Sequence, residues 1–321
     1  MKAISSCLAV VLSLPLVATA QSQSYPTRPI RVIVPFTAGD TVDILARLVG
    51  QKITETLGQQ VIIDNRPGAT GMLGLELAAR ATPDGYTIAL GQGGNLVIAP
   101  HTQRRPPYDP VKDFAAIAQL VSNGLVLVVH PSSPFRNVKD LVDYARANPG
   151  KLTFASNGEG GFVHLSFELL RQQTGFTYVH IPYKGLAPSL TDLMSGQVMA
   201  SMPTLVAVGQ HVKSGKLRIL GTTNPTRAPQ IPDIPAIAES VPGYESRGWF
   251  GFVAPAATPR EIVARLNQEI NKAMGMADVR EKIVAAGFTI DTGAPDYFAA
   301  TIRNDFAKYG KLIRDIGLQP Q

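Results

Sequence analysis

Short runs of β-branched residues alternate with longer stretches of helical character along this chain of 321 residues, and that alternation limits the possible fold more than any other feature. Strands that alternate with helices are typical of parallel, doubly wound sheets. The expected strands are Ile30–Val34, Val61–Asp64, Thr87–Leu90, Leu125–Val129, Leu152–Phe154, Val198–Ser201, Leu217–Gly221 and Phe250–Val253. The expected helices include Thr41–Leu57, Val138–Ala147, Phe162–Thr174, Ala187–Ser195, Pro259–Met274 and Tyr297–Ile316. The sequence therefore predicts an α/β fold.

The first twenty residues have the pattern of an export signal. Lys2 precedes an apolar stretch, Leu8 to Val17, of about ten residues, which is too short for a membrane-spanning helix. Ala18-Thr19-Ala20 has the small residues of a signal-peptidase site, so cleavage is expected before Gln21. Residues 1–20 are thus predicted to be a signal peptide of a periplasmic protein. The alternative is a buried N-terminal helix.

Charge and rare residues exclude several function classes. Thirty Lys and Arg against 24 Asp and Glu give a net charge of +6, but the longest basic run is Arg104-Arg105, so no nucleic-acid partner is expected. A single Cys excludes a disulfide framework, and five His spread singly give no support for a metal site. The hydrolase motif G-x-S-x-G and the zinc motif H-E-x-x-H are absent. We expect neither a metal nor another cofactor, and no catalytic residues.

The loop after the first expected strand is a candidate anion site. Its small residues allow backbone N–H groups to face a cleft, and the helix that follows has a partial positive charge at its N-terminus. The alternative is an ordinary capped helix without a ligand. The candidate residues are Phe36, Thr37, Ala38, Gly39, Asp40 and Thr41.

A second, glycine-rich loop follows the strand Leu152–Phe154. Three glycines in four positions indicate positive φ angles or a close approach to the backbone. The loop matches neither a P-loop nor a dinucleotide-binding motif, and we expect it to bind an anion through backbone donors. Its candidate residues are Ser156, Asn157, Gly158, Gly160, Gly161 and His164. His164 is expected to orient the loop and not to transfer protons.

Two further segments could add polar groups to the same cleft. Gly91-Gln92-Gly93-Gly94-Asn95 follows a strand, and Gln92 is the candidate ligand residue there. Tyr183-Lys184-Gly185 could contribute Tyr183 and a positive charge, although a solvated turn would have the same sequence.

Several short motifs occur in a fixed order along the chain. They are Tyr25-Pro26 before Pro29-Ile30-Arg31, Asn65-Arg66-Pro67-Gly68, Pro83-Asp84-Gly85-Tyr86, Tyr108-Asp109-Pro110 before Lys112-Asp113-Phe114, Ser156-x-Gly158-x-Gly160 to His164, Pro182-Tyr183-Lys184-Gly185, Ser214-Gly215-Lys216-Leu217-Arg218 and Trp249-Phe250-Gly251. In this order they resemble the substrate-binding proteins of tripartite tricarboxylate transporters, the TctC-like receptors of the Bug family. The resemblance runs from Tyr25 to about Gly317.

The resemblance implies a type II periplasmic-binding-protein fold, in which two doubly wound lobes joined by a hinge close over a ligand. We expect lobe one to comprise residues 25–124 and 248–321, and lobe two residues 125–247. The implied ligands are di- and tricarboxylates, acidic amino acids and aromatic acids, with one carboxylate held by the two loops. The implied partners are the membrane subunits of a transporter, and we expect a monomer.

Two alternatives to a transport receptor stay open. A periplasmic ligand sensor would pass its signal to a partner such as a sensor kinase. An exported α/β enzyme acting on a small acid is less favoured, because no nucleophile–base pair is legible in the sequence.

The chain departs from the family pattern at two positions that border the expected cleft. The family loop reads Pro-Phe-x-x-Gly-Gly-x-x-Asp, but Asp40 replaces the second Gly. Pro203, beside the candidate residue Thr204, stands where the family often has an Asp. Asp40 could cap the helix, with Asp43 three residues later, or pair with a ligand amino group, or accept a hydrogen bond from a ligand hydroxyl or protonated acid.

Overall fold

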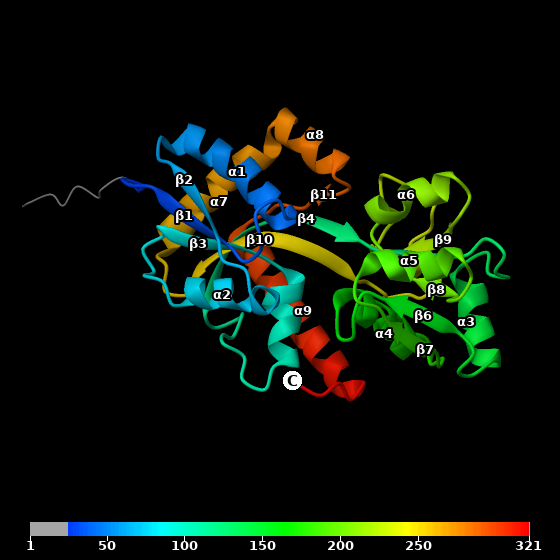
Figure 1. Cartoon of the computed structure of the whole chain (residues 1–321). Helices are drawn as coiled ribbons and strands as arrows, with labels where there is room; N and C mark the ends of the chain where they lie inside the picture. Colours follow the sequence, from blue (N-terminus) through cyan, green and yellow to red (C-terminus); the bar gives the residue numbers. More distant parts are fainter. Residues whose placement is uncertain (1–24, 321) are drawn as a thin grey trace, which may run out of the picture.

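The computed structural model describes residues 25–320, so the predicted signal peptide, residues 1–20, lies outside the described residues. Two mixed sheets form the frame of the molecule (Figure 1). The six-stranded sheet, in the order β11-β4-β10-β3-β1-β2, contains β1 (Ile30–Val34), β2 (Val61–Asn65), β3 (Thr87–Gln92), β4 (Phe114–Gly124), β10 (Arg247–Pro255) and β11 (Thr289–Ile290). The five-stranded sheet, in the order β7-β6-β8-β5-β9, contains β5 (Val126–Val129), β6 (Thr153–Ser156), β7 (Val179–Pro182), β8 (Ala200–Ser201) and β9 (Arg218–Thr222).

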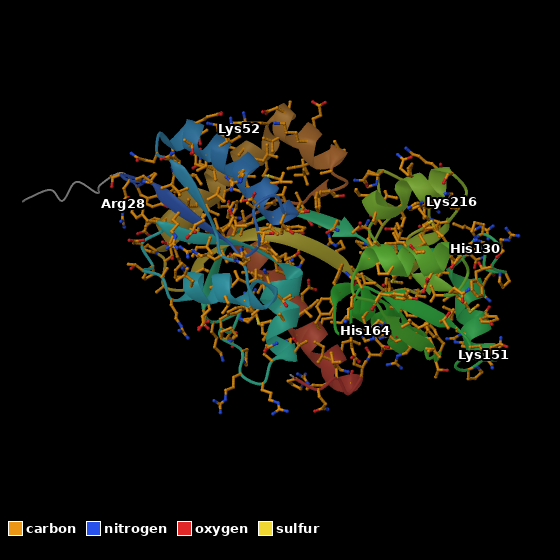
Figure 2. All side chains as sticks on the ribbon, in the orientation of Figure 1. Arg28, Lys52, His130, Lys151, His164 and Lys216 are labelled. Carbon is orange, nitrogen blue, oxygen red and sulfur yellow. The ribbon has the colours of Figure 1, made fainter. Side chains whose placement is uncertain are left out.

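Helices cover both faces of each sheet. They are α1 (Thr41–Leu57), α2 (Met72–Ala79), α3 (Val138–Ala147), α4 (Phe162–Thr174), α5 (Leu186–Met194), α6 (Leu205–Lys213), α7 (Arg260–Gly275), α8 (Ala277–Ala285) and α9 (Pro295–Asp315). None of them is long and apolar enough to cross a membrane, within residues 25–320. Figure 2 shows Lys52, Lys151 and Lys216 on separate parts of the surface.

The alternation of side chains along the strands explains these layers. In β1, Val32 and Val34 pack in one core with residues of α1, α7 and α8, while Ile33 packs in another with residues of α2 and α9. In β5, Leu127 packs with residues of α3 and α4, while Val128 packs with residues of α5 and α6. Successive residues of a strand point to opposite faces, so each strand is buried from both sides.

The expectation of parallel sheets is correct only in part, because β1 pairs parallel with β2 and β3, and β6 with β7 and β8. β10 pairs antiparallel with both β3 and β4, and β5 pairs antiparallel with β8 and β9. The reason is topological, because β4 carries the chain from the first sheet toward the second and β10 carries it back. Sequence reasoning also missed β4, β7, β11 and the helices α2, α6 and α8.

The two strands β4 and β10 mark where the chain passes between the sheets. Strands of the first sheet come from residues 30–124 and 247–290, and those of the second from residues 126–222. We therefore keep as a proposal lobe one at residues 25–124 and 248–321, and lobe two at residues 125–247.

The last helix, α9, contacts both proposed lobes. It packs on β4 and, near its end, on α4. The Phe162 ring of α4 meets the Tyr309 ring of α9 edge-on, with ring centroids 6.4 Å apart. Gln172 Nε2 donates to Asp315 Oδ2 at 2.6 Å. One side of the interlobe boundary is thus closed by helix packing.

The packing of α9 predicts the effect of a methyl group at Gly251 in β10. A Cβ atom there would lie 2.3 Å from the Phe298 ring and 2.8 Å from the Ala118 carbonyl oxygen. We expect Gly251→Ala to lower the free energy of unfolding in urea by about 1–3 kcal/mol, because backbone and a packed ring must shift. The matched control is Gly209→Ala in α6, where no atom lies within 4 Å of the added Cβ. It should gain about 1 kcal/mol from helix propensity; equal effects of the two would contradict the prediction.

Candidate functional site

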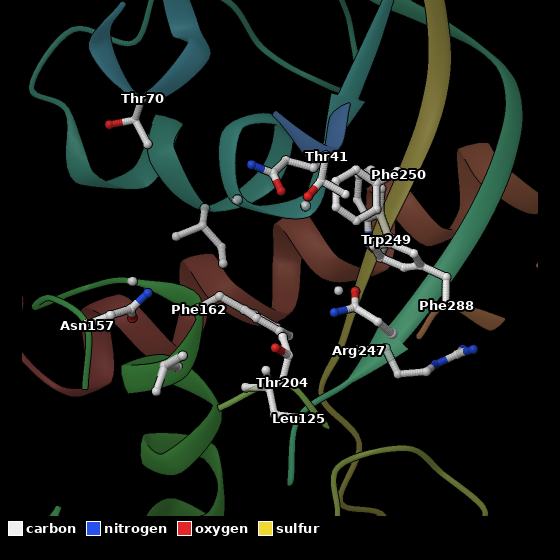
Figure 3. A pocket seen from close by; sticks show the side chains of 18 of the residues that line it. Thr41, Thr70, Leu125, Asn157, Phe162, Thr204, Arg247, Trp249, Phe250 and Phe288 are labelled. Carbon is white, nitrogen blue, oxygen red and sulfur yellow. The ribbon is translucent and has the colours of Figure 1, made fainter. Parts of the chain in front are cut away.

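A cleft of about 1220 Å³ lies between the two sheets and is lined by residues of both (Figure 3). Thr41, Trp249 and Phe250 line it on the side of the six-stranded sheet. Asn157 and Phe162 line it on the side of the five-stranded sheet. The first turns of α1 and α4 therefore meet the same space from opposite sides.

At the N-terminus of α1, two carboxylates take up backbone N–H groups. Asp40 is the N-cap and its Oδ1 accepts from Val42 N at 2.9 Å. Buried Asp43 accepts from Gly39 N at 2.9 Å and from Arg47 Nε at 2.9 Å. Burial alone would raise the pKa of Asp43, but the hydrogen bonds from Arg47, Gly39 and Asn65 lower it to about 2. Asp40 thus makes the contact that the capping alternative requires.

Most of this first loop stays outside the cleft. Thr41 lines the cleft, whereas the five residues before it do not. Thr37 and Gly39 are exposed, and the internal bond from Gly39 to Asp43 holds the loop over its own helix. The candidates that the structure leaves out of the lining are Phe36, Thr37, Ala38, Gly39 and Asp40.

Side chains accept hydrogen bonds from the backbone of the second loop. Gly160 N donates to His164 Nδ1 at 3.0 Å, and Gly158 N donates to Ser156 Oγ at 3.2 Å. Ser156 Oγ also lies 2.7 Å from His180 Nε2. The N–H groups of Gly158 and Gly160, which were expected to hold an anion, are therefore already occupied within the protein. Asn157, Gly160 and Gly161 still line the cleft, and Ser156, Gly158 and His164 lie behind it.

Unpaired donors occur instead in the first turn of α4. Within residues 25–320, the backbone N–H groups of Phe162, Val163 and His164 have no hydrogen-bond acceptor. Phe162 and Val163 line the cleft. Sequence reasoning missed these two residues, although the first N–H groups of any helix lack partners within the helix. The predicted start of the helix at Phe162 would have been sufficient to identify them.

His164 and His180 form a stacked pair under the loop. Their ring centroids are 3.9 Å apart and their planes differ by 2°. Burial, with the neighbouring His180, lowers the pKa of His164 to about 4, and burial also lowers the pKa of His180. His164 is therefore neutral near pH 7, as its Nδ1 must be to accept from Gly160 N.

Of the remaining candidate residues, some line the cleft and others do not. Gln92 and Thr204 line the cleft. Tyr183 does not, and its hydroxyl donates to Asp192 Oδ2 at 2.6 Å. The expected loop at residues 91–95 is wrong in part, because β3 continues through Gln92 and a π-helical turn, Gly94–Ile98, follows.

Sequence reasoning also missed an apolar wall of the cleft. Trp249, Phe250 and Phe288 line it from the six-stranded side, with Leu125 and Phe162 opposite (Figure 3). The Trp249 indole Nε1 donates to Asp305 Oδ2 at 2.8 Å, which fixes the ring. No group of three or more His, Cys, Asp or Glu that could hold a metal occurs in the described part of the chain.

Comparisons with known proteins agree on one family. Residues 45–318 match the model of the tripartite tricarboxylate transporter family receptor. A Pseudomonas protein encoded in the tcbD-tcbE intergenic region is 39% identical over 292 residues, covering 90% of this chain and 87% of that protein.

Solved structures give the same result. The R. palustris protein Rpa4515 with adipate is 35% identical, has a TM-score of 0.73, and is matched over 92% of this chain and 100% of that chain. A TctC solute-binding protein from Polaromonas is 27% identical, has a TM-score of 0.83, and is matched over 91% and 100%. The resemblance predicted from the motifs is confirmed, as is the two-lobed α/β binding-protein fold.

The histidine stack predicts a pH dependence of stability. Because the folded pKa of His164 is about 4 against an ordinary value of 6.5, the unfolded chain takes up a proton first as the pH falls. The contribution of neutral His164 to the free energy of unfolding is complete above pH 6.5 and decreases as the pH falls to about 4. At pH 5 the decrease amounts to about 2 kcal/mol.

We therefore expect that, between pH 7 and pH 5, the free energy of unfolding decreases by about 2 kcal/mol less in His164→Gln than in the parent protein. Urea denaturation at each pH measures it. His211→Gln, on α6 away from the stack, should follow the parent. A His164→Gln curve parallel to that of the parent would contradict the prediction.

Proposed function

Because the chain belongs to the family of tripartite tricarboxylate transporter receptors, we propose that it is a periplasmic receptor that captures a small organic carboxylate in its interlobe cleft. It then delivers the ligand to the membrane subunits of a tripartite transporter. It acts by binding and release and carries out no chemistry on the ligand.

The observation that carries this proposal is the N-terminus of α4 at the cleft. Phe162 and Val163, whose backbone N–H groups are unpaired, line the cleft in the first turn of α4. A helix N-terminus has a partial positive charge and free donors, which together stabilise an anion. A carboxylate held there would also meet the residues that line the cleft from the six-stranded side, which would draw the lobes together.

The solved relatives support the carboxylate class. The R. palustris protein of similar fold contains adipate, a dicarboxylate. Delivery to a transporter requires release as well as capture, and the two strands β4 and β10 that join the lobes provide a hinge for both.

A thermal-shift screen tests the proposal. The panel contains aliphatic, aromatic and amino acids that carry one to three carboxylates, with matched alcohols and amides as uncharged controls. A carboxylate at a hundredfold excess over its dissociation constant should stabilise the protein by about 2.7 kcal/mol, because it binds only the folded state. A panel in which no carboxylate raises the Tm, or in which the alcohols raise it equally, would overturn the proposal.

The second loop gives a sharper test by substitution. Gly160 has φ +70°, and a Cβ there would lie 2.9 Å from the Leu318 side chain. We expect Gly160→Ala to weaken binding of the best acid of the panel by about tenfold, since the strained loop no longer aligns the first turn of α4.

The matched control is Gly175→Ala at the other end of α4. Gly175 has φ +73° with no atom within 4 Å of an added Cβ. We expect Gly175→Ala to lower the free energy of unfolding by about 1 kcal/mol, as Gly160→Ala does, but to keep the ligand affinity of the parent protein. Calorimetric titration measures both affinities, and an unchanged affinity of Gly160→Ala would count against this role of the loop.

A further inference from the structure

We propose that the ligand is a monocarboxylate with an apolar body, such as a phenyl ring on a short chain. This inference rests on the proposed function and narrows its ligand class. It excludes di- and tricarboxylates and amino acids as the preferred ligands of this chain.

The apolar wall of the cleft favours an apolar body. Trp249, Phe250 and Phe288 line the cleft and are 2%, 8% and 8% exposed, so Phe250 and Phe288 present most of the few accessible aromatic atoms on this side. Phe162 faces them from the other lobe, directly beside the unpaired N–H groups of α4 (Figure 3). A ligand whose carboxylate meets α4 therefore places its next atoms among aromatic rings, where apolar groups are favoured.

The cations of the cleft leave no buried partner for a second carboxylate. Arg247 is the half-buried one, and its Nε and Nη1 already donate to Glu245 Oε1 at 2.7 Å and to Asp291 Oδ2 at 3.1 Å. Arg47 is paired with the buried Asp43. Lys282 is exposed on α8. Because the unpaired N–H groups of α4 serve the first carboxylate, a second one would lose water without gaining these donors or a free cation, which is unfavourable.

The acids of the cleft likewise leave no buried partner for a ligand ammonium. Asp305 accepts from the Trp249 indole and pairs with Lys308 at 2.7 Å. Asp40 caps α1 and does not line the cleft. Glu159 lines the cleft but is exposed, so it remains hydrated. An α-amino group on the ligand would be desolvated without compensation.

Isothermal titration of three acids of similar size tests the inference. The first acid, 3-phenylpropanoate, has one carboxylate and a phenyl ring. Adipate has a second carboxylate in place of the ring, and phenylalanine keeps the ring and adds an amino group. We expect 3-phenylpropanoate to bind at least about tenfold more tightly than either of the others. Adipate or phenylalanine binding as tightly would overturn the inference while the proposed function stands. If no carboxylate of the screening panel binds, both are overturned.

Substitutions in the cleft separate the apolar wall from the charges. Phe162→Ala removes the ring but keeps its backbone N–H, so it should weaken 3-phenylpropanoate about tenfold. Ile44, on α1, adds an exposed apolar side chain to the lining of the cleft, and Ile44→Ala should weaken 3-phenylpropanoate binding about threefold without disturbing a core residue. Lys282→Ala should leave its affinity unchanged. Leu77→Ala, on α2 outside the cleft, is the matched apolar control.

The affinities of these variants distinguish the contribution of the apolar wall from that of Lys282. Loss of 3-phenylpropanoate binding in Phe162→Ala and Ile44→Ala, with a parent-like Tm, supports the apolar wall. Parent-like affinity in both variants, or a larger loss in Lys282→Ala than in either, would overturn the inference.

Discussion

The antiparallel pairing of β4 with β10 is the interaction on which the rest of the molecule depends. It joins the outgoing and returning chain by hydrogen bonds from Phe114–Gly124 to Arg247–Pro255. Because both crossings use one ribbon, the two sheets stay side by side and leave a cleft between them. The same ribbon inserts β10 beside β3, which makes the first sheet mixed and brings Trp249 and Phe250 to the cleft.

Several polar groups of the loops that border the cleft are satisfied by hydrogen bonds within the protein. Asp40 and Asp43 bind the N–H groups of Val42 and Gly39, and His164 binds that of Gly160. Buried polar groups that lack partners are costly. The few donors left unpaired in α4 are therefore exceptional, and two of them belong to residues that line the cleft, Phe162 and Val163. Preorganised donors of this kind bind an anion without rearrangement.

Local sequence patterns were sufficient for the elements whose character is local. β1, α1, α3 and α4 have the predicted bounds, because a local apolar pattern specifies each of them, and a terminal glycine also ends α1 and α4. β4 was missed because its run of Ala115, Ala116 and Ala118 has low strand propensity, and only burial between neighbouring strands makes it a strand. Hydrogen-bond direction between distant strands is not a local property, so the mixed sheets could not be read from periodicity.

The same distinction holds for the candidate site. The two strand-to-helix loops were found because glycines and a helix start are visible in the sequence. Whether each residue faces the cleft depends on internal bonds, as between Gly39 and Asp43, which spacing does not reveal. The apolar wall combines Leu125, Phe162, Trp249 and Phe288 from four places in the chain, and only the topology brings them together.

The contact of α9 with α4 has a consequence for how such a receptor can change during evolution. Tyr309 and Asp315 touch Phe162 and Gln172 of α4, so in the proposed receptor the balance between open and closed forms would include the strength of this contact. Apparent affinity scales with the fraction of molecules in the binding-competent form. Replacements on this helix face can therefore adjust how strongly the receptor retains its ligand while the cleft itself, and with it the choice of ligand, stays the same. Affinity and selectivity are thereby open to separate selection.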